Sequence, residues 1–578
     1  MKGKNKESKV NLIDKINNFI DNVDSKITDS KGQKVSINIY EVLKKIIVFM
    51  IILFLVFLAV KAFYKTGYFK STYDLALEKT EYKYDNIFEN IFYILVILTI
   101  IYLLQKLFTK IKLKYVIPII IVLTLCLFIS FVLTLDLVPI ADQGQLMILG
   151  EKIYNNHLFL DFENDNYLAM FPYQYGIALY IGVVIEIVEN LNNFLNLEYY
   201  SYLQIINSIC SVFSMILLYL IGNRIFDDNN RAKKILIVLI ILFGFYFMFF
   251  NTHVYGNVPG LMFALFALLC TIRYVQNGKI YNLIAGGISI FVAYYLKTNY
   301  QIFLIGMIVI LVFNILKKIE IKKFIGIVVL LLIFILPGKL GDMIFSQMIG
   351  QSIPKGVPML TYMFMGWAPT NTLSPGWYTG DVIEIFTRNE FEHDKAKEET
   401  EKLIEERQEE FLNDIPNFLY YALDKLESTW INPTFQTIWC ATPGEDRIKG
   451  NEEYKKYLKE NSWIIDMVNY DSEVYHIEER VLDAFSVIIF TFSAVGLVYI
   501  FKENNKEKEK ESAKLLLIII FIGGAAFHFL LWETKAIYVI QYYFLLLPYA
   551  AIGLDKIFEI IENRRQNGAQ RVNQNKED

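Results

Sequence analysis

The sequence predicts an all-α polytopic membrane protein. Of its 578 residues, 54% are hydrophobic and 15% are aromatic. Many apolar runs reach roughly 16 to 22 residues, the length that crosses a bilayer as a helix. Several runs are continuous enough to exclude a soluble core, and basic residues gather in alternate loops between them. Composition, run length and charge placement therefore indicate the same class.

We expect about twelve spanning helices, counted from apolar runs of this length. Their expected positions are residues 44–63, 88–108, 115–137, 201–222, 235–251, 257–274, 280–296, 300–316, 323–338, 483–501, 515–532 and 537–554. Because the number of crossings is even, both termini should lie on one side of the membrane.

Basic residues identify the cytoplasmic side, because short loops rich in lysine and arginine remain there. Such clusters lie in one alternating set of loops, at 106–114, 224–234, 317–323 and 502–514. We therefore expect a multi-pass protein of the cell membrane with both termini in the cytoplasm. The opposite loops, including a large polar region, would face outside.

The expected organisation follows from these spans. A polar N-terminal segment precedes the first helix, with no cleavable signal peptide. The expected parts are a cytoplasmic segment (1–43), two N-terminal spans (44–114), a membrane core (115–338) with a first outer loop (138–172) and an interfacial helix (173–191), an extracytoplasmic region (339–482), three last spans (483–554) and a cytoplasmic tail (555–578).

Two of these segments, 173–191 and 339–482, are not simple spans. Residues 173–191 are apolar enough to span, but a crossing there would place the basic loop 224–234 outside. The positive-inside rule therefore favours an interfacial helix with aromatic flanks. Residues 339–482 have too few apolar residues for a large core of their own. We expect helices at 390–412 and 414–430 in that region, packed on the membrane bundle.

Some chemistries have no visible site. The cysteines Cys126, Cys210 and Cys270 lie in apolar runs and Cys440 lies apart, so neither a disulfide framework nor a cysteine metal site is expected. The sequence shows no Walker loop and no Rossmann glycine motif, so ATP-driven transport and cytosolic nucleotide-sugar chemistry lack a site. No nucleic-acid partner is expected.

Acidic residues in the first outer loop are the leading candidates for chemistry. Asp142 follows the third expected span, where a carboxylate could act as a general base on an acceptor hydroxyl beside a bilayer-embedded substrate. A helix-end acid facing water is the alternative. Asp161, Glu163 and Asp165 could bind a divalent cation through oxygen ligands, or could form a solvated acidic loop. No cofactor is otherwise implied.

Basic and histidine side chains gather at the same expected side. Lys297 stands between two spans, where it either snorkels to the interface or pairs with an anion such as a lipid phosphate. His253 lies at another outer helix boundary. Glu533 and Lys535 lie in the tight turn before the last helix, and burial without partners would be costly for them.

These residues, with their neighbouring motifs, are similar to those of a known family. The motifs are the acid after an early span, Phe171-Pro172-Tyr173-Gln174-Tyr175-Gly176, the Tyr255…Pro259 turn, Leu296-Lys297-Thr298-Asn299, Gly376-Trp377-Tyr378 and Glu533-Thr534-Lys535-Ala536-Ile537-Tyr538. The chain resembles the GT-C class of integral membrane glycosyltransferases. Within that class it looks like the branch of protein O-mannosyltransferases and lipid A aminoarabinose transferases, in a Gram-positive form.

The resemblance implies an inverting glycosyltransferase. The donor would be a polyprenyl-phosphate-linked sugar, and the acceptor a cell-wall polymer, glycolipid or protein outside the membrane. Asp142 would be the general base, and Lys297, Lys535 and His253 would bind the donor phosphate. Residues expected to contact substrate are Tyr167, Tyr173, Gln174, Tyr255, Asn299, Trp377, Tyr378, Glu533 and Tyr538.

One departure and one alternative accompany this prediction. The O-mannosyltransferases carry Asp-Glu in the first outer loop, whereas this chain has Asp142-Gln143. A lipid-linked glycan flippase could also use charges at a cavity mouth. Such transporters usually show charges at the bilayer midplane and internal repeats, and neither is visible in this sequence.

Overall fold

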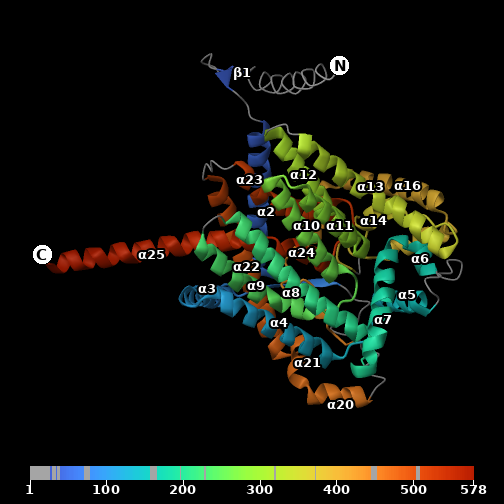
Figure 1. The fold of residues 1–578 in the computed structure, drawn as a ribbon, viewed down its shortest axis with the longest axis horizontal. Helices are drawn as coiled ribbons and strands as arrows, with labels where there is room; N and C mark the ends of the chain where they lie inside the picture. Colours follow the sequence, from blue (N-terminus) through green and yellow to red (C-terminus); the bar gives the residue numbers. More distant parts are fainter. Residues whose placement is uncertain are drawn as a thin grey trace, which may run out of the picture.

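The computed structural model describes residues 27–28, 34–35, 39–69, 79–155, 166–195, 197–226, 229–317, 321–370, 373–443, 452–502 and 508–577. The fold is mainly helical (Figure 1). Among the described residues, nine helices are long and apolar enough to cross a membrane. A polytopic all-α membrane protein is therefore confirmed.

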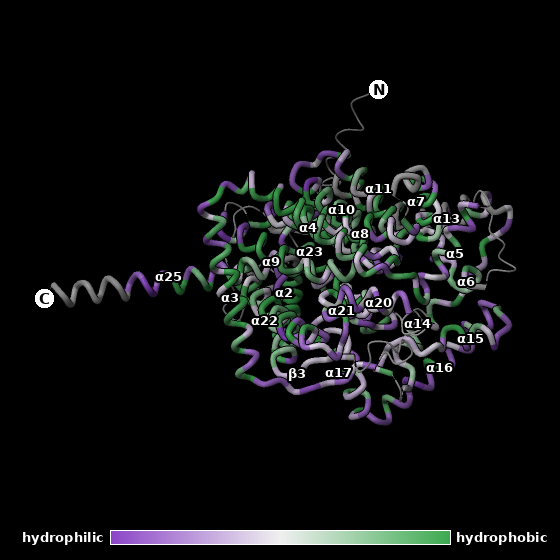
Figure 2. Tube along the Cα trace, turned by 90° about the horizontal axis from the view of Figure 1, so that it is seen from below, coloured by the Kyte–Doolittle hydropathy of each residue, from purple (hydrophilic) through white to green (hydrophobic). Residues whose placement is uncertain are grey.

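The nine helices coincide with nine of the twelve expected spans. They are α2 (Ile39–Tyr64), α3 (Ile87–Lys110), α4 (Leu113–Leu135), α8 (Tyr199–Ile225), α9 (Asn230–Phe250), α10 (Asn257–Asn277), α12 (Gln301–Lys317), α22 (Glu473–Lys502) and α23 (Lys508–Leu530). Their apolar lengths meet the requirement of a bilayer core. Figure 2 shows hydrophobic residues concentrated along α2, α9, α22 and α23.

The other three expected spans are also helical but differ from a simple crossing. α11 (Ile280–Leu296) has only 17 residues, and α13 (Ile321–Ile349) continues beyond the expected end at 338. α24 (Ala536–Phe544) and α25 (Leu547–Glu577) are bent by 55° at their junction, and as one broken span they would make a tenth crossing. Figure 1 shows α25 projecting away from the bundle.

The segment expected as the first outer loop contains helices of its own. α5 (Asp142–Asn155) and α6 (Asn166–Met170) precede the short 3₁₀ turn η1 (Pro172–Gln174) and α7 (Tyr175–Leu195). α5 and α7 pack closely, because a Cβ at Gly150 would lie 2.3 Å from Cγ2 of Ile181. α7 also packs on α8 and α11, and this set of contacts fixes the start of α5 against the bundle.

The large polar region forms mostly short helices. They pack on the main hydrophobic core and on two small hydrophobic clusters, one around Phe364 and Ile385 and one around Tyr362 and Met365. Its helices are α14 (Met359–Met365), α15 (Asp381–Arg388), α16 (His393–Asn413), α17 (Ile415–Trp430), α18 (Thr437–Cys440), α20 (Glu452–Glu460) and α21 (Ser462–Val468). The helices expected at 390–412 and 414–430 are confirmed as α16 and α17. Figure 2 shows many hydrophilic residues along α16.

An unexpected hairpin ties this region to the N-terminal helices. β3 (Lys65–Phe69) and β4 (Thr80–Tyr84) pair antiparallel, with Gly67 opposite Tyr82. The backbone nitrogen of Gly67 donates to the carbonyl of Ile431 at 3.0 Å, and Glu427 of α17 forms ion pairs with Lys61 and Lys65. A second short pair joins β1 (Ile27–Thr28) to β2 (Lys34–Val35).

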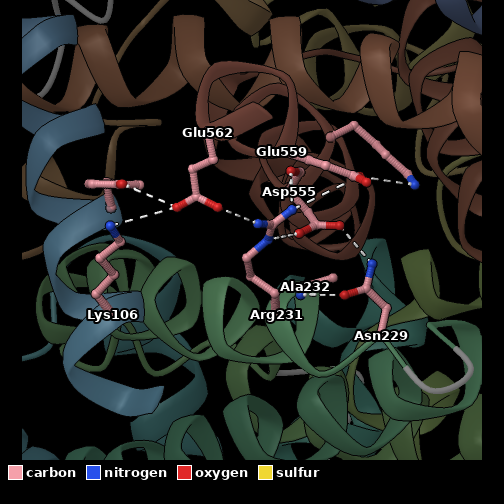
Figure 3. Close-up of polar contacts among 9 residues, drawn as sticks. Lys106, Asn229, Arg231, Ala232, Asp555, Glu559 and Glu562 are labelled. Carbon is pink, nitrogen blue, oxygen red and sulfur yellow. Dashed lines mark hydrogen bonds and ion pairs between the residues drawn. The ribbon is translucent and has the colours of Figure 1, made fainter. Parts of the chain in front are cut away.

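Charged residues anchor α25 to α3 and α9 (Figure 3). Arg231, in the first turn of α9, pairs with Asp555 and with Glu562, the latter at 3.0 Å. The amide of Asn229 donates to Asp555 at 2.7 Å, and Lys106 lies 3.7 Å from Glu562. Each partly buried charge in this network therefore has an opposite charge nearby.

Candidate active site

Asp142 is the first residue of α5, and the chain is strained to place it there. α4 ends at Asp136 in the left-handed conformation, with φ 45°, and Ala141 has φ 48°. Such backbone costs an alanine roughly 1–2 kcal/mol, so the packing of α5 must hold it. The carboxylate of Asp142 is exposed at the helix N-terminus, where the helix dipole favours negative charge. The position predicted from sequence therefore presents a fixed, accessible acid.

Tyr255 joins Asp142 to two other segments, those of Gln174 and Lys297. Its hydroxyl donates to Oδ2 of Asp142 at 2.8 Å and accepts from Nε2 of Gln174 at 2.6 Å. The ammonium of Lys297 lies 3.6 Å from the centroid of the Tyr255 ring, a cation–π distance. Four residues spread from 142 to 297 thus meet in one place, and we call them the Asp142 cluster. Three were expected to bind donor or acceptor, and one to act as the base.

Two turns bring Tyr255 and Lys297 together. Gly256 follows Tyr255 with φ 78°, and a Cβ there would lie 2.1 Å from the carbonyl oxygen of Leu296. Only glycine allows the α9–α10 turn to approach the α11–α12 turn so closely. Lys297 ends α11 directly before the 3₁₀ turn η2 (Thr298–Tyr300), and Asn299 is buried in that turn. The sequence motifs at 255–259 and 296–299 are therefore neighbouring walls of one site.

Electrostatics distinguish Lys297 from His253. Burial lowers the pKa of Lys297 to about 8, although the negative charges of Asp142 and Glu533 oppose that shift. Lys297 is therefore still mostly charged at pH 7. Burial, together with the cations Lys297 and Lys535, lowers the pKa of His253 to about 3. His253 is thus neutral and cannot supply the positive charge expected of it, although its ring lies beside the Asp142 cluster, 5.5 Å from the ring of Tyr255.

Glu533 lies near the Asp142 cluster, close enough for its charge to act on Lys297. Its Oε1 accepts a hydrogen bond from the hydroxyl of Tyr538 at 2.6 Å. The preceding Trp532 stacks on Tyr362, with ring centroids 4.2 Å apart, and Tyr362 contacts the hydroxyl of Tyr173 at 3.0 Å. These contacts join the turn before α24 to η1 and α14. They place Glu533, Tyr538 and Tyr173, three residues expected to contact substrate, on one continuous wall.

The remaining expected substrate contacts divide into two groups. Burial raises the pKa of Tyr167, and so do the charge of Asp142 and the nearby Tyr173. Burial also raises the pKa of Tyr378, and its next causes are Glu533 and Asp142. Both phenols therefore stay protonated beside the acids. Trp377 is 1% exposed and its indole donates to Ser428, so it packs beneath the site and supports Tyr378.

Gln143 has a structural role in place of the second acid. Its Oε1 accepts from the hydroxyl of Tyr200 and from the backbone nitrogen of Val254, each at 2.7 Å. A glutamate could accept both bonds but would bury a charge, which is costly without a cation. Gln143 is 5% exposed. The Asp-Gln pair therefore anchors the turn carrying Tyr255 to the start of α5.

Metal binding receives no support from the described residues. Asp161, Glu163 and Asp165 lie outside them, so that prediction is untested. Elsewhere in the described ranges, no group of three or more His, Cys, Asp or Glu side chains is arranged to hold a metal ion.

An aromatic groove lies beside the Glu533 wall. Its volume is about 330 Å³, and its lining comes from α14, α16, α17 and the end of α23. Trp367, Phe411, Phe418 and Phe529 form much of the lining, with Arg407 at one side. The exposed side chains of Leu530, which ends the membrane-spanning helix α23, and of Leu531 also line this groove.

Comparison with known families adds independent evidence. Residues 200–338 match the family model described as dolichyl-phosphate-mannose-protein mannosyltransferase. The chain is a membrane glycosyltransferase. The matched segment contains His253, Tyr255, Lys297 and Asn299, while Asp142 and Glu533 lie outside it. None of the curated proteins matches the chain.

Sequence reasoning missed several residues that shape this glycosyltransferase site. Tyr200 and Tyr362 lie in ordinary helical patterns, and nothing in their spacing indicates a site. Lys425 lies in α17 among alternating polar and apolar residues, yet it is fully buried. A lysine at an expected core position of an amphipathic helix is the one signal that could have singled it out.

Proposed function

We propose that the protein transfers a sugar from a polyprenyl-phosphate donor to an extracytoplasmic acceptor with inversion at the anomeric carbon. The family description names dolichyl-phosphate-mannose, which favours mannose or a similar hexose. The observation that carries the proposal is the hydrogen bond between Tyr255 and Asp142 at 2.8 Å, with the Lys297 ammonium over the same ring. The proposed base, Asp142, and the proposed phosphate-binding cation, Lys297, thus both contact the side chain of Tyr255.

In this mechanism the acceptor hydroxyl attacks the anomeric carbon while Asp142 takes its proton. The bond between that carbon and the phosphate oxygen breaks, and its electron pair leaves with polyprenyl phosphate. Lys297 and Lys535 would bind the phosphate, whose negative charge grows in the transition state. His253, being neutral, would contribute hydrogen bonding. This mechanism requires no metal, because Asp142 accepts the proton of the acceptor and the two lysines neutralise the departing phosphate.

The substrate walls follow from the same geometry. Tyr167, Tyr173, Gln174, Tyr255, Asn299, Tyr378, Glu533 and Tyr538 would contact the sugar or acceptor. The aromatic groove beside Trp367 supports a role for the 339–482 region in choosing the acceptor, since aromatic faces stack on sugars and apolar chains. A cell-wall polymer, a glycolipid and a protein all remain acceptors that this wall could admit.

We also propose the membrane arrangement. The chain would cross the cell membrane twelve times, with α11, α13 and the α24–α25 pair as crossings and α7 at the interface. Both termini would be cytoplasmic and the Asp142 cluster would face outside, because the basic loops at 106–114, 224–234, 317–323 and 502–514 favour the cytoplasmic side. Labelling of single cysteines introduced at Glu151 and Arg565 with a membrane-impermeant maleimide tests it. Labelling of the second alone in intact cells would contradict it.

The test of the chemistry is Asp142→Asn, assayed with radiolabelled polyprenyl-phosphate mannose and an extract of acceptor glycans. The variant should lose about 10³-fold or more in turnover, because an amide cannot take the proton. Asp136→Asn is a matched control, since Asp136 is exposed and has φ 45°, a conformation that asparagine tolerates. Near-normal turnover by Asp142→Asn would refute the proposed base.

A further inference from the structure

Lys425 of α17 is buried where a charge is costly. It is 0% exposed. Its ammonium donates to the carbonyl of Gly366 at 2.6 Å and contacts that of Trp532 at 3.4 Å. It also lies 4.4 Å from the ring centroid of Trp367. Among the described residues, no carboxylate forms an ion pair with it. A buried ammonium without a paired carboxylate is costly, and its hydrogen bonds to the two carbonyls offset only part of that cost.

Those hydrogen bonds hold the segment that carries Glu533. Lys425 binds the carbonyl on one side of Glu533, at Trp532. On the other side, the backbone nitrogen of Thr534 donates to Gly376 at 2.7 Å, and the hydroxyls of Thr534 and Thr429 lie 2.7 Å apart. Helix α17 therefore fixes both neighbours of Glu533, through Lys425 and Thr429, which are one turn apart.

Two glycines, Gly366 and Gly376, leave the space that the Lys425 side chain and the Trp532 carbonyl occupy. A Cβ at Gly366 would lie 2.4 Å from the carbonyl oxygen of Trp532, and a Cβ at Gly376 would lie 2.6 Å from Cε of Lys425. Burial lowers the pKa of Lys425 to about 7, while the negative charge of Glu533 opposes the shift. The charge of Glu533 therefore acts on Lys425, although the contact of Lys425 with this segment is to the backbone carbonyl of Trp532.

We infer that Lys425 is a positioning residue for glycosyl transfer, which holds the Trp532–Thr534 segment so that Glu533 meets the substrate. This inference rests on the proposed function. It assigns Lys425 no contact with the substrate. Its effect on turnover should therefore pass through Glu533, and a double-mutant cycle measures that dependence directly.

The cycle uses Lys425→Met, Glu533→Gln and the double variant in the full-length enzyme, with polyprenyl-phosphate mannose as donor. Methionine keeps much of the apolar stem and removes the ammonium. We expect Lys425→Met to lower kcat roughly tenfold or more while the donor KM changes less than about twofold, because misplacement by about 1 Å is costly for catalysis. In the Glu533→Gln background the same change should lower kcat by less than about twofold.

Lys65→Met is the matched control, because Lys65 also pairs with α17 through Glu427 and Glu427 keeps its partner Lys61. It should lower kcat less than about twofold. If Lys425→Met does not fold, Thr429→Val replaces it in the cycle, since it loosens the same segment and leaves the lysine in place.

The outcomes separate the two ideas. Losses that multiply across the cycle, or a normal kcat in folded Lys425→Met, would overturn the positioning role even if Asp142→Asn is inactive. Full activity of Asp142→Asn would instead overturn the proposed function.

Discussion

The two ends of α9 use charge in opposite ways. At its first turn, Arg231 is surrounded by Asp555 and Glu562, and the amide of Asn229 completes the network (Figure 3). Beyond its last turn, the ring of Tyr255 lies under the ammonium of Lys297, which comes from the end of α11. In the described part of the chain, no carboxylate lies within ion-pair distance of that ammonium. One end satisfies its charges internally, whereas the other keeps a cation available for a ligand.

The difference separates stability from function. A satisfied network fixes the position of α25 and gains little from any further anion. A cation whose negative neighbours act only at longer range gains most when an anion binds. Variants near Arg231 should therefore lose stability, whereas variants at Lys297 should lose activity, and experiments can test this difference.

The largest expected effect belongs to Lys297→Met. Transition-state charge on the departing phosphate would lose its nearest cation, so kcat/KM should fall about 10²-fold or more. The melting temperature should stay the same or rise, because a partly desolvated charge has been removed. Transfer assays and thermal unfolding in one detergent measure both. A variant that is unstable but normally active per folded molecule would reverse the comparison.

Arg231→Met should give the opposite pattern. It leaves Asp555, which is 2% exposed, without its cation, and we expect a loss of about 2 kcal/mol in unfolding free energy after allowing for partial solvent exposure. The kcat of the folded fraction should stay within about twofold. A large loss of kcat at unchanged melting temperature would show that the network takes part in catalysis.

Gly256→Ala tests the turn that joins Tyr255 to Lys297. Its Cβ would clash with the Leu296 carbonyl, which must move because backbone cannot rotate away. We expect kcat/KM to fall roughly tenfold, as positioned groups are displaced. Gly278→Ala is the matched control, since its φ of 65° carries similar strain with nothing within 4 Å. Equal losses in both variants would mean that strain, and not the site, is responsible.

The pH dependence of Lys297 should be smaller and has a defined sign. Its pKa is about 8 in the folded protein and 10.5 ordinarily. As pH rises through about 8 the cation is lost, so kcat/KM should fall. Between about 8 and 10.5 the unfolded chain holds more protons, so this lysine's contribution to stability should rise with pH. Lys297→Arg stays charged and should keep its activity to higher pH. An unchanged alkaline limb in that variant would exclude Lys297 as its cause.

The sequence predicts most of the scaffold, because apolar length and basic loops are local signals. Asp142, Tyr255, Lys297 and Glu533 could be chosen because each is a polar residue at a helix boundary. Their mutual contacts could not be predicted, since they depend on how α5, α10 and α12 pack. The neutral state of His253 depends on that packing too.

Other features are equally non-local. The β3–β4 hairpin is held against Ile431 and Glu427, which lie far away in the sequence. Gln143 looks like a missing acid until its partners Tyr200 and Val254 are known. The role of Lys425 likewise cannot be predicted from local sequence, because its partners are the carbonyls of Gly366 and Trp532. In each case the polar group is explained by a partner more than fifty residues away.

The most direct test of the account measures donor binding and turnover side by side in Asp142→Asn and Lys297→Met. With a fluorescent polyprenyl-phosphate mannose, Asp142→Asn should bind the donor within about threefold of wild type and give no detectable transfer, because the base acts only in the chemical step. Lys297→Met should bind it at least about tenfold more weakly. Weak donor binding by Asp142→Asn, together with normal binding by Lys297→Met, would contradict the division of the site into base and phosphate cation.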